Sequence, residues 1–534
     1  MDLDQRPSDA QRLSDAQLLL TSGAYQEAEA TAQAVLAEAP GNARATRLAG
    51  LAVAAMGETA RAARILLVAA AADPDREHPC MTFARMEPQF PRRLVGRLFQ
   101  ACLLLAPDDA RLRLAYAEYL IDLDDAAEAA AVLAEAPDTA PARHLRGLAQ
   151  AELGRFAAAL EDFRRATELD PQAAPSWSNL GMMLKIEGRF AEAITAHDRA
   201  VALAPADPRF LVNRAVAHLK SGQWDMAWPD YEARFDLPGA APVDKVRLLP
   251  ALGSGDDLSG VTIAALHEDG FGDTLHFCRY LPLLAAWGAR VVACVPPALE
   301  RVMRIVPGVA EVVTDLHALP AHDAICPMFS LPGVFRTSIE TIPPCPRLVI
   351  DPRLLRYWGQ QLPAGSALKV GLVWAGQARP GAPGFAALDR RRSAGLAAFA
   401  PLFAVPGVQF VSLQKGPPVR QEPPPGLALC DPMPQARDFA DTAAIIANLD
   451  VVVSVDTSVV HLAGLVGVPV FMMDRYDNCW RWLHGRDDSP WYPLLRIFRQ
   501  ERPDDWPGAM TRAAAALDAI AKSSSPAAMR GRAP

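Results

Sequence analysis

The chain has 534 residues, 51% of them hydrophobic, and a formal net charge of −8 at pH 7. This length exceeds what one hydrophobic core supports, so we expect three or more domain-sized units. The acidic balance gives no electrostatic reason to bind nucleic acid or an anionic membrane surface, and we expect neither as a partner. The eight cysteines are scattered without a C-x-x-C pair, which argues against a zinc site and against a secreted disulfide framework.

The first residues, 1–7, are polar and acidic and lack the basic and then apolar pattern of a signal peptide. No apolar stretch reaches the length needed to cross a bilayer. We therefore expect a cytoplasmic protein without a membrane span, whose cysteines remain reduced thiols.

The first half of the chain repeats itself every 34 residues (181 − 147 = 34). One set of residues returns as a second: Gly147, Gly154, Phe156, Ala159, Ala166 and Pro171 as Gly181, Gly188, Phe190, Ala193, Ala200 and Pro205. The same step relates residues 23, 28 and 40 to 57, 62 and 74, and residues 188, 190 and 193 to 222, 224 and 227. Small residues let paired helices approach closely, and proline ends the second helix of each pair. The pattern resembles the tetratricopeptide repeat, which forms a curved solenoid.

Residues 78–136 keep the alanine-rich helical pattern but lose its phase, and we interpret them as degenerate or insertion-bearing repeats. Asn179 and Asn213 occupy the same place in successive repeats (213 − 179 = 34). An amide side chain can hydrogen-bond the backbone of an extended peptide without reading its sequence. The alternative is that two polar residues coincide on a solvated face.

From about residue 261 short β-branched runs alternate with helical stretches, which is typical of parallel-sheet α/β domains. We expect strands of a first lobe at residues 261–266, 291–295, 312–313 and 323–326. Strands of a second lobe are expected at residues 370–374, 408–413, 451–455 and 468–473, after a hinge at 343–366. Ligands of such folds lie outside the carboxyl ends of the strands, so the informative residues should follow strands.

The first such segment, residues 267–274, follows the first strand. Gly270 and Gly272 permit a tight turn and close approach of the backbone to a substrate. Asp273 then lies at the mouth of the next helix, where its carboxylate could take a proton from an attacking hydroxyl. The alternative is that Asp273 simply caps that helix. Asp269 adds a carboxylate nearby, which could raise the pKa of the base.

The second segment contains Asp456 and Thr457, which start a helix after a buried strand, and His461. His461 lies four residues past Thr457 (461 − 457 = 4), so both side chains share one helical face. A helix N-terminus already binds phosphate, and these side chains would add donors. The alternative is a capped helix that carries a satisfied histidine.

Further basic and aromatic residues follow other strands. Lys415 could neutralise a leaving diphosphate, or it could be an exposed loop lysine. The run Arg390–Arg392 offers positive charge near the same edge, or forms a solvated face. Aromatic residues at 480–482 and 490–493 could stack on a base or sugar ring, or close the two lobes on each other.

Taken in order, several motifs resemble one known group. They are Glu268-x-Gly270-x-Gly272-Asp273-Thr274, Ser330-Leu331-Pro332, Gly371-x-Val373-Trp374-Ala375-Gly376, Ser412-Leu413-Gln414-Lys415-Gly416 and Val455-Asp456-Thr457-x-x-x-His461-Leu462-Ala463-Gly464, extended by Trp480-Arg481-Trp482 and Pro490-Trp491-Tyr492. The group is the bacterial tetratricopeptide-repeat proteins whose transferase domain is similar to the heptosyltransferases and, more distantly, to the O-linked N-acetylglucosamine transferases. The resemblance spans nearly the whole chain.

The resemblance implies an α-helical solenoid over residues 1–236 and then a GT-B-type pair of doubly wound Rossmann-like lobes. The acceptor-side lobe would cover residues 237–350 and the nucleotide-sugar-side lobe 351–534, with a disordered tail from about residue 523. Asp273 matches the group's proposed base, and Asp456, Thr457 and His461 match its donor-binding element. Further candidate donor-binding residues are Lys415, Gly376 and Arg392, and candidate acceptor-binding residues are Gly272, Asn179 and Asn213.

The implied activity is that of an inverting glycosyltransferase with a nucleotide-sugar donor, without a metal or another cofactor. The Asp-x-Asp motifs that another transferase fold would use, at residues 2–4 and 122–124, lie outside the α/β half. The repeats would present a protein acceptor, such as flagellin or another surface protein. Two alternatives stay open: a lipid-linked or polysaccharide acceptor, and a repeat scaffold with an inactive transferase domain. The sequence departs from the group at Asp269, commonly glutamine there, and in an Ala/Gly/Pro-rich loop at 376–387.

Overall fold

The computed structural model describes residues 7–86, 89–253, 255–378, 386–425 and 427–523. The chain forms two compact units, Met1–Pro171 and Gln172–Pro534. The tail predicted to be disordered and most of the loop at 376–387 lie outside the described residues.

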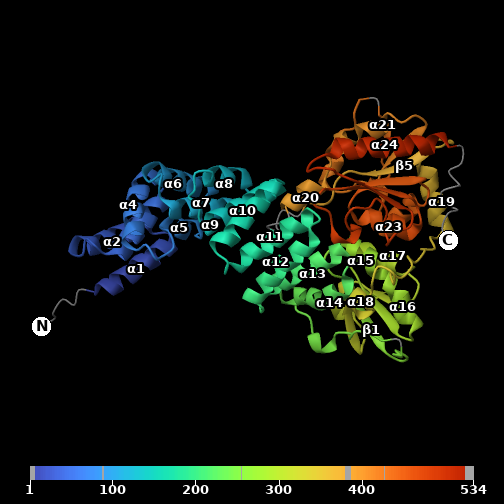
Figure 1. Ribbon diagram of the computed structural model, residues 1–534, viewed down its shortest axis with the longest axis horizontal. Helices are drawn as coiled ribbons and strands as arrows, with labels where there is room; N and C mark the ends of the chain where they lie inside the picture. Colours follow the sequence, from blue (N-terminus) through green and yellow to red (C-terminus); the bar gives the residue numbers. More distant parts are fainter. Residues whose placement is uncertain (1–6, 87–88, 254, 379–385, 426, 524–534) are drawn as a thin grey trace. The chain divides into compact units, whose positions relative to one another are not determined.

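The first unit is built from helices that pack in consecutive pairs (Figure 1). They are α1 (Asp9–Ser22), α2 (Tyr25–Glu38), α3 (Ala43–Ala55), α4 (Thr59–Ala72), α5 (Pro79–Ala84), α6 (Arg92–Leu105), α7 (Ala110–Asp122), α8 (Ala126–Leu133), α9 (Ala140–Glu152) and α10 (Phe156–Leu169). The segment that loses the repeat's phase contains two short helices, α5 of 6 residues and α8 of 8. A helical solenoid in this half of the chain is confirmed.

The glycines of the repeat lie where paired helices touch. A Cβ on Gly147 would lie 2.7 Å from the ring of Phe163, on the partner helix. In the next repeat, a Cβ on Gly181 would lie 2.7 Å from the ring of His197. The spacing is the same in both pairs (163 − 147 = 16; 197 − 181 = 16), so glycine at this position admits a ring from the second helix.

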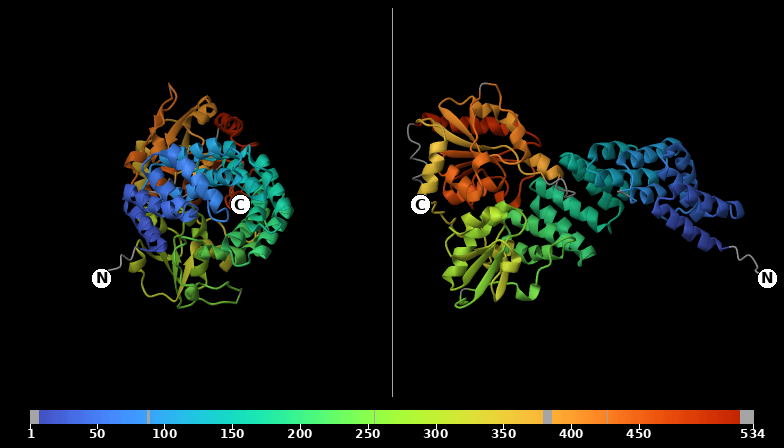
Figure 2. Two further views of the ribbon diagram at one scale, coloured as in Figure 1. Left: turned by 90° about the vertical axis from the view of Figure 1, so that its left-hand side faces the viewer. Right: turned by 180° about the vertical axis from the view of Figure 1, so that it is seen from behind.

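The second unit begins with two further helix pairs and continues into two sheets. The helices are α11 (Ala174–Ile186), α12 (Phe190–Leu203), α13 (Pro208–Ser221) and α14 (Trp224–Tyr231), followed by the short helix η1 (Glu232–Asp236). The first sheet has the order β3-β2-β1-β4, with β1 (Thr262–Leu266), β2 (Arg290–Cys294), β3 (Val309–Val313) and β4 (Ala324–Pro327). Around it lie α15 (Phe271–Phe277), α16 (Leu281–Ala286), α17 (Pro297–Met303) and α18 (Leu331–Val334) (Figure 2).

The second sheet has the order β10-β9-β8-β5-β6-β7. Its strands are β5 (Leu368–Val373), β6 (Val408–Ser412), β7 (Leu429–Cys430), β8 (Val451–Val455), β9 (Val470–Asp474) and β10 (Leu495–Arg499). The helices are α19 (Pro352–Gln361), α20 (Ala386–Arg392), α21 (Ala400–Phe403), α22 (Phe439–Ile446), α23 (Ser458–Val466) and α24 (Trp506–Lys522). Side chains of α24 and α21 pack on one face, and those of α22 and α23 on the other. Figure 1 shows α21 and α24 on one side of the sheet and α23 on the opposite side.

Every pair of neighbouring strands in both sheets is parallel. The parallel-sheet α/β part predicted from the sequence is therefore confirmed. All eight expected strands are present with ends shifted by up to three residues, while β7 and β10 were not expected. The first and second sheets are linked by an ion pair, since Arg301 of α17 lies 3.0 Å from Asp438 and 3.2 Å from Asp441 of α22.

Helices α13 and α14 are packed into the α/β part of the second unit. The ring of Trp224 stacks on that of Trp491, with centroids 5.1 Å apart and planes at 17°. The indole of Trp228 donates to the carbonyl of Thr337 at 2.9 Å. The buried ammonium of Lys220 donates to the Asn478 carbonyl at 2.8 Å and to its side-chain oxygen at 2.5 Å. Burial lowers the pKa of Lys220 to about 7.

Gly464, the last residue of the Asp-Thr-x-x-x-His-Leu-Ala-Gly motif, lies in α23 beneath the ring of Tyr492, which a Cβ would overlap. The ring is 2% exposed, and its hydroxyl lies near His276 and His461, so it has little room to move. We expect Gly464→Ala to lower the free energy of unfolding by about 1–3 kcal/mol, despite alanine's better helix propensity.

Urea denaturation of the two variants Gly464→Ala and Gly255→Ala would check this expectation. A Cβ on Gly255 meets no atom within 4 Å, so that substitution should leave the stability unchanged. Equal midpoints for both variants would contradict the packing argument.

Candidate functional site

The two sheets approach each other through the first turns of α15 and α23, the helices that follow β1 and β8. A Cβ on Gly272 would lie 3.1 Å from Cδ2 of His461 and 3.3 Å from Cα of Ser458. The structure therefore places Gly272 against α23. Its lack of a side chain lets the N-terminal turns of the two helices come together.

Asp273 holds two different partners. Its Oδ2 accepts the Gly270 N–H at 3.2 Å, which is the helix cap that the sequence offered as an alternative. Its Oδ1 accepts from Nη2 of Arg481 at 2.6 Å. The side chain keeps 21% of its surface exposed. Burial raises the pKa of Asp273; Arg481 opposes this, while Asp269 and Asp456 add to it, and the net shift is upward.

Arg481 lies at the candidate site beside Asp273, and the sequence analysis did not assign it a role. It belongs to the short helix η9 (Trp480–Trp482), and its side chain is 10% exposed. The guanidinium lies 4.9 Å from the ring centroid of Trp480 and 5.3 Å from that of Phe277. A basic residue within the Trp-Arg-Trp motif was the available signal, but its carboxylate partner is 208 positions away.

The start of α23 lacks a side-chain cap among the described residues. Thr457 is the N-cap residue, yet its side chain makes no capping hydrogen bond among the described residues. Instead, its hydroxyl lies 3.1 Å from that of Ser454. The first backbone N–H groups of α23 are therefore left without a side-chain cap, as at helix N-termini that bind anions. Asp456, at the end of β8, is partly exposed beside them.

His461 does not point into open space as a phosphate ligand would. Its ring stacks on Trp482, with centroids 5.6 Å apart and planes at 15°. Its Nδ1 lies 2.9 Å from the hydroxyl of Tyr492, which is also 3.0 Å from Nδ1 of His276. Burial lowers the pKa of His461 well below its usual value, so the imidazole is neutral. The structure thus places His461 among the aromatic rings of Trp482, Tyr492 and His276. This arrangement corresponds to the alternative interpretation, in which the histidine is held by packing and hydrogen bonding within the protein.

Four predicted or newly noted residues follow adjacent strands of the second sheet. Gly376 follows β5, Lys415 follows β6, Asp456 follows β8 and Arg475 follows β9. The carboxyl ends of parallel strands lie along one edge, so these residues share that edge. Burial disfavours the charged form of Arg475, but Asp477 and Asp456 hold its pKa above the ordinary value.

The remaining candidate donor-binding residues, Lys415 and Arg392, already form hydrogen bonds within the protein. The Lys415 ammonium donates to the carbonyl of Ala436 at 2.5 Å. The guanidinium of Arg392 donates to Asp389 at 2.8 Å, and a Cβ on Gly376 would lie 2.7 Å from its Nε. Gly376 is therefore where the strand end passes close to Arg392.

The two candidate peptide-binding asparagines lie on successive first helices of the repeats, Asn179 on α11 and Asn213 on α13. The Asn213 amide donates to the hydroxyl of Ser178 at 3.0 Å. Both asparagines are part-exposed and lie in the same unit as the two sheets. Among the described residues, no group of three or more His, Cys, Asp or Glu side chains could hold a metal ion. Within the same part of the chain, no helix is long and apolar enough to span a membrane.

Comparison with known proteins supports the repeat part directly. The family model described as tetratricopeptide repeat matches residues 13–77, 144–208 and 187–241. The curated protein FlbA of Caulobacter vibrioides is 28% identical over 505 residues, covering 80% of this chain and 81% of that protein. The chain thus carries tetratricopeptide repeats and is similar to FlbA over most of its length.

Solved structures give weaker likenesses. The glycosyl transferase family 9 protein from Veillonella parvula is 13% identical with a TM-score of 0.36, covering 46% of this chain and 87% of that one. MamA is 20% identical with a TM-score of 0.25, covering 26% of this chain and 85% of that one. A glycosyl transferase is therefore among the structural neighbours of this chain.

Proposed function

We propose that the chain is a glycosyltransferase of the GT-B type, which moves a sugar from a nucleotide-sugar donor to a hydroxyl of a polypeptide acceptor. The observation that carries the proposal is that Gly272, next to Asp273, packs between the two sheets against the N-terminus of α23, which has no side-chain cap. Asp273 supplies a carboxylate of raised pKa, and the start of α23 supplies backbone N–H groups without a side-chain cap.

In the proposed reaction the donor's diphosphate lies at the start of α23. Backbone N–H groups there, with Thr457 and Arg475, would stabilise the charge that grows on the leaving phosphate. Asp273 takes the proton of the acceptor hydroxyl. At the same time, the oxygen of that hydroxyl bonds to the anomeric carbon from the side opposite the phosphate. The bond from that carbon to the phosphate oxygen breaks, so the nucleoside diphosphate leaves and the configuration inverts.

Arg481 fits this chemistry as the partner that keeps a buried base ionised. Without a nearby cation, burial would favour the protonated carboxyl, which cannot accept a proton. The opposing influences of burial and Arg481 leave the pKa of Asp273 above the ordinary aspartate value. Such a base is stronger than an exposed aspartate.

The repeats support a polypeptide as the acceptor. Asn179 and Asn213 lie on equivalent helices, α11 and α13, which belong to the same compact unit as Asp273. An extended segment bound along these helices would have its backbone held by amide groups. The donor's nucleotide, the independence from metal and the cytoplasmic location stay predictions.

Donor binding is the first test of the proposal. Calorimetry of the full chain with UDP-, GDP-, ADP- and CMP-sugars should show one nucleotide bound at micromolar concentration. Thr457→Val removes one hydroxyl at the start of α23. It should lower the affinity for that donor about tenfold, the effect expected for a lost hydrogen bond to a charged group. Thr511→Val, the same change on α24, should have no effect. A folded protein that binds none of the donors would favour the scaffold alternative.

The pH profile of kcat/KM tests the role of Arg481. Because the pKa of Asp273 is raised, the acid limb should lie above the ordinary aspartate value of about 4, activity being lost as pH falls through that pKa. Arg481→Met removes the cation that opposes the rise, so its acid limb should move to higher pH. Arg481→Lys keeps the charge and should shift the limb much less. An acid limb that stays in place in Arg481→Met would show that another group is titrating.

A further inference from the structure

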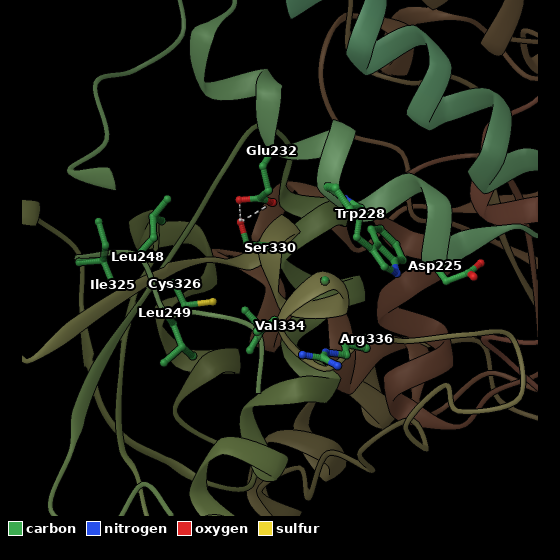
Figure 3. Close-up of a pocket in the computed structure, with 13 residues that line it drawn as sticks. Asp225, Trp228, Glu232, Leu248, Leu249, Ile325, Cys326, Ser330, Val334 and Arg336 are labelled. Carbon is green, nitrogen blue, oxygen red and sulfur yellow. Dashed lines mark hydrogen bonds between the residues drawn. The ribbon is translucent and has the colours of Figure 1, made fainter. Parts of the chain in front are cut away.

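A cavity of about 360 Å³ lies where the last repeat helix meets the first sheet (Figure 3). Trp228 of α14 forms one wall. Residues of β4, of α18 and of the segment before β1 form the others. Its volume is in the range of small-molecule and side-chain binding sites. The apolar part of its lining comprises Trp228, Leu248, Leu249, Ile325, Cys326 and Val334.

The polar wall of this cavity carries unbalanced charge. Arg234 pairs with two carboxylates, Glu232 at 2.7 Å and Glu268 at 3.0 Å. One guanidinium facing two carboxylates leaves one net negative charge, and the side chains of Arg234, Glu268 and Glu232 are 11%, 22% and 41% exposed. Glu232 is the member that lines the cavity, where its carboxylate also accepts from the hydroxyl of Ser330 at 3.0 Å.

The rim of the cavity adds no net charge. Asp225 and Arg336 are the other charged residues that line the cavity, and their charges are opposite (Figure 3). The cavity therefore combines an apolar lining with the one net negative charge that Glu232 and Glu268 leave beside Arg234. The Glu232 side chain is 41% exposed, so a cation entering the cavity can reach it and balance this charge.

We propose that this cavity binds the side chain of a lysine or arginine. The aliphatic part of such a side chain lies along Trp228, Leu249 and Val334, and its cationic end reaches Glu232. An acidic ligand is repelled by Glu232 and Glu268, and a purely apolar one leaves the negative charge without a partner. That the basic residue belongs to the acceptor polypeptide rests on the proposed function.

The position of the cavity supports this assignment. Glu232 is joined through Arg234 to Glu268, which lies five residues before Asp273 (273 − 268 = 5) in the loop after β1. Glu268 also accepts the backbone N–H of Phe329 at 3.2 Å, so the same carboxylate ties that loop to the cavity wall. A basic residue bound at Glu232 would thus be held two ion pairs away from the loop that carries the proposed base.

Ligand-observed saturation-transfer NMR on the full chain tests the cavity without any donor. The probes are the N-acetyl amides of lysine, arginine, norleucine and glutamate. Lysine or arginine amide should bind in the millimolar range, and norleucine amide, which has the same stem without the charge, about tenfold more weakly. Glutamate amide should not bind. Equal binding of norleucine and lysine amides, or no binding of either basic probe, would overturn the proposal.

Two variants locate the binding. Glu232→Gln removes the negative charge, and Val334→Trp fills the cavity; each should abolish the signal of the basic probes. Glu311→Gln, a change of the same kind on β3, should leave it unchanged. A signal that persists in both cavity variants, shown by melting to be folded, would also overturn the proposal. Because no donor is present, a positive result would stand even if donor binding failed, and a negative one would leave the proposed transferase activity untouched.

Discussion

Asp273→Asn should lower the rate of sugar transfer by about 10²–10⁴-fold, the usual contribution of a general base. An amide cannot accept the hydroxyl proton, but its oxygen can still accept from Gly270 N–H and from Arg481, the two partners that the carboxylate has now. Donor affinity should therefore change little. The measurement is a single-turnover assay with the donor identified by calorimetry, combined with a titration of that donor.

Asp269→Asn is the matched control for this variant. Asp269 is four residues before Asp273 (273 − 269 = 4) and has a positive φ of 55°, a conformation that asparagine adopts readily. The change removes a neighbouring charge that raises the pKa of Asp273, so it should extend activity slightly to lower pH. Comparable losses in both variants would indicate a general effect of charge in this loop. An unchanged rate in Asp273→Asn would exclude this residue as the base.

A chain that starts at Gln172 should fold, whereas one that starts at residue 237 should not. The shorter chain lacks α13 and α14, which supply Trp224, Trp228 and Lys220 to the α/β part. Without them the ring of Trp491 loses its stacked partner and Asn478 its ammonium partner. Near-ultraviolet circular dichroism and cooperative urea unfolding of the two truncated chains distinguish the outcomes.

A single substitution on α14 should also show that this helix stabilises the α/β part. Trp224 is 1% exposed, so Trp224→Ala should cost about 3–5 kcal/mol of the free energy of unfolding. Met226 on the same helix is 58% exposed, and Met226→Ala should change stability by less than about 0.5 kcal/mol. A native-like signal and cooperative unfolding in the chain from residue 237 would show that the last repeat is dispensable for the fold.

The elements that follow from local pattern were predictable from the sequence. The repeat helices and the strands rest on periodicity within short windows, and the glycines at 147 and 181 rest on a repeated position. β7 and β10 were missed for different reasons. β7 has 2 residues, and the alternation in β10, with Arg496 exposed between Leu495 and Ile497, is that of an edge strand rather than of a continuous apolar run.

The contacts of the site residues could not be read from the same windows. Spacing correctly places Thr457 and His461 one turn apart, but the side chains that cover His461 come from Trp482 and Tyr492, beyond the helix. In the same way, Gly272 follows a strand as expected, while its close neighbour Ser458 belongs to the other sheet's helix. Sequence pattern gives the position of a residue along an element, and tertiary packing decides what that residue faces.

The division between the compact units falls directly after Pro171, the residue that follows the last helix of one repeat and precedes the first helix of the next. A boundary between complete repeats is a place where recombination can join arrays of different length in frame, without cutting a helix pair. The array of residues 1–171 could therefore diverge or be exchanged while the second unit keeps its packing.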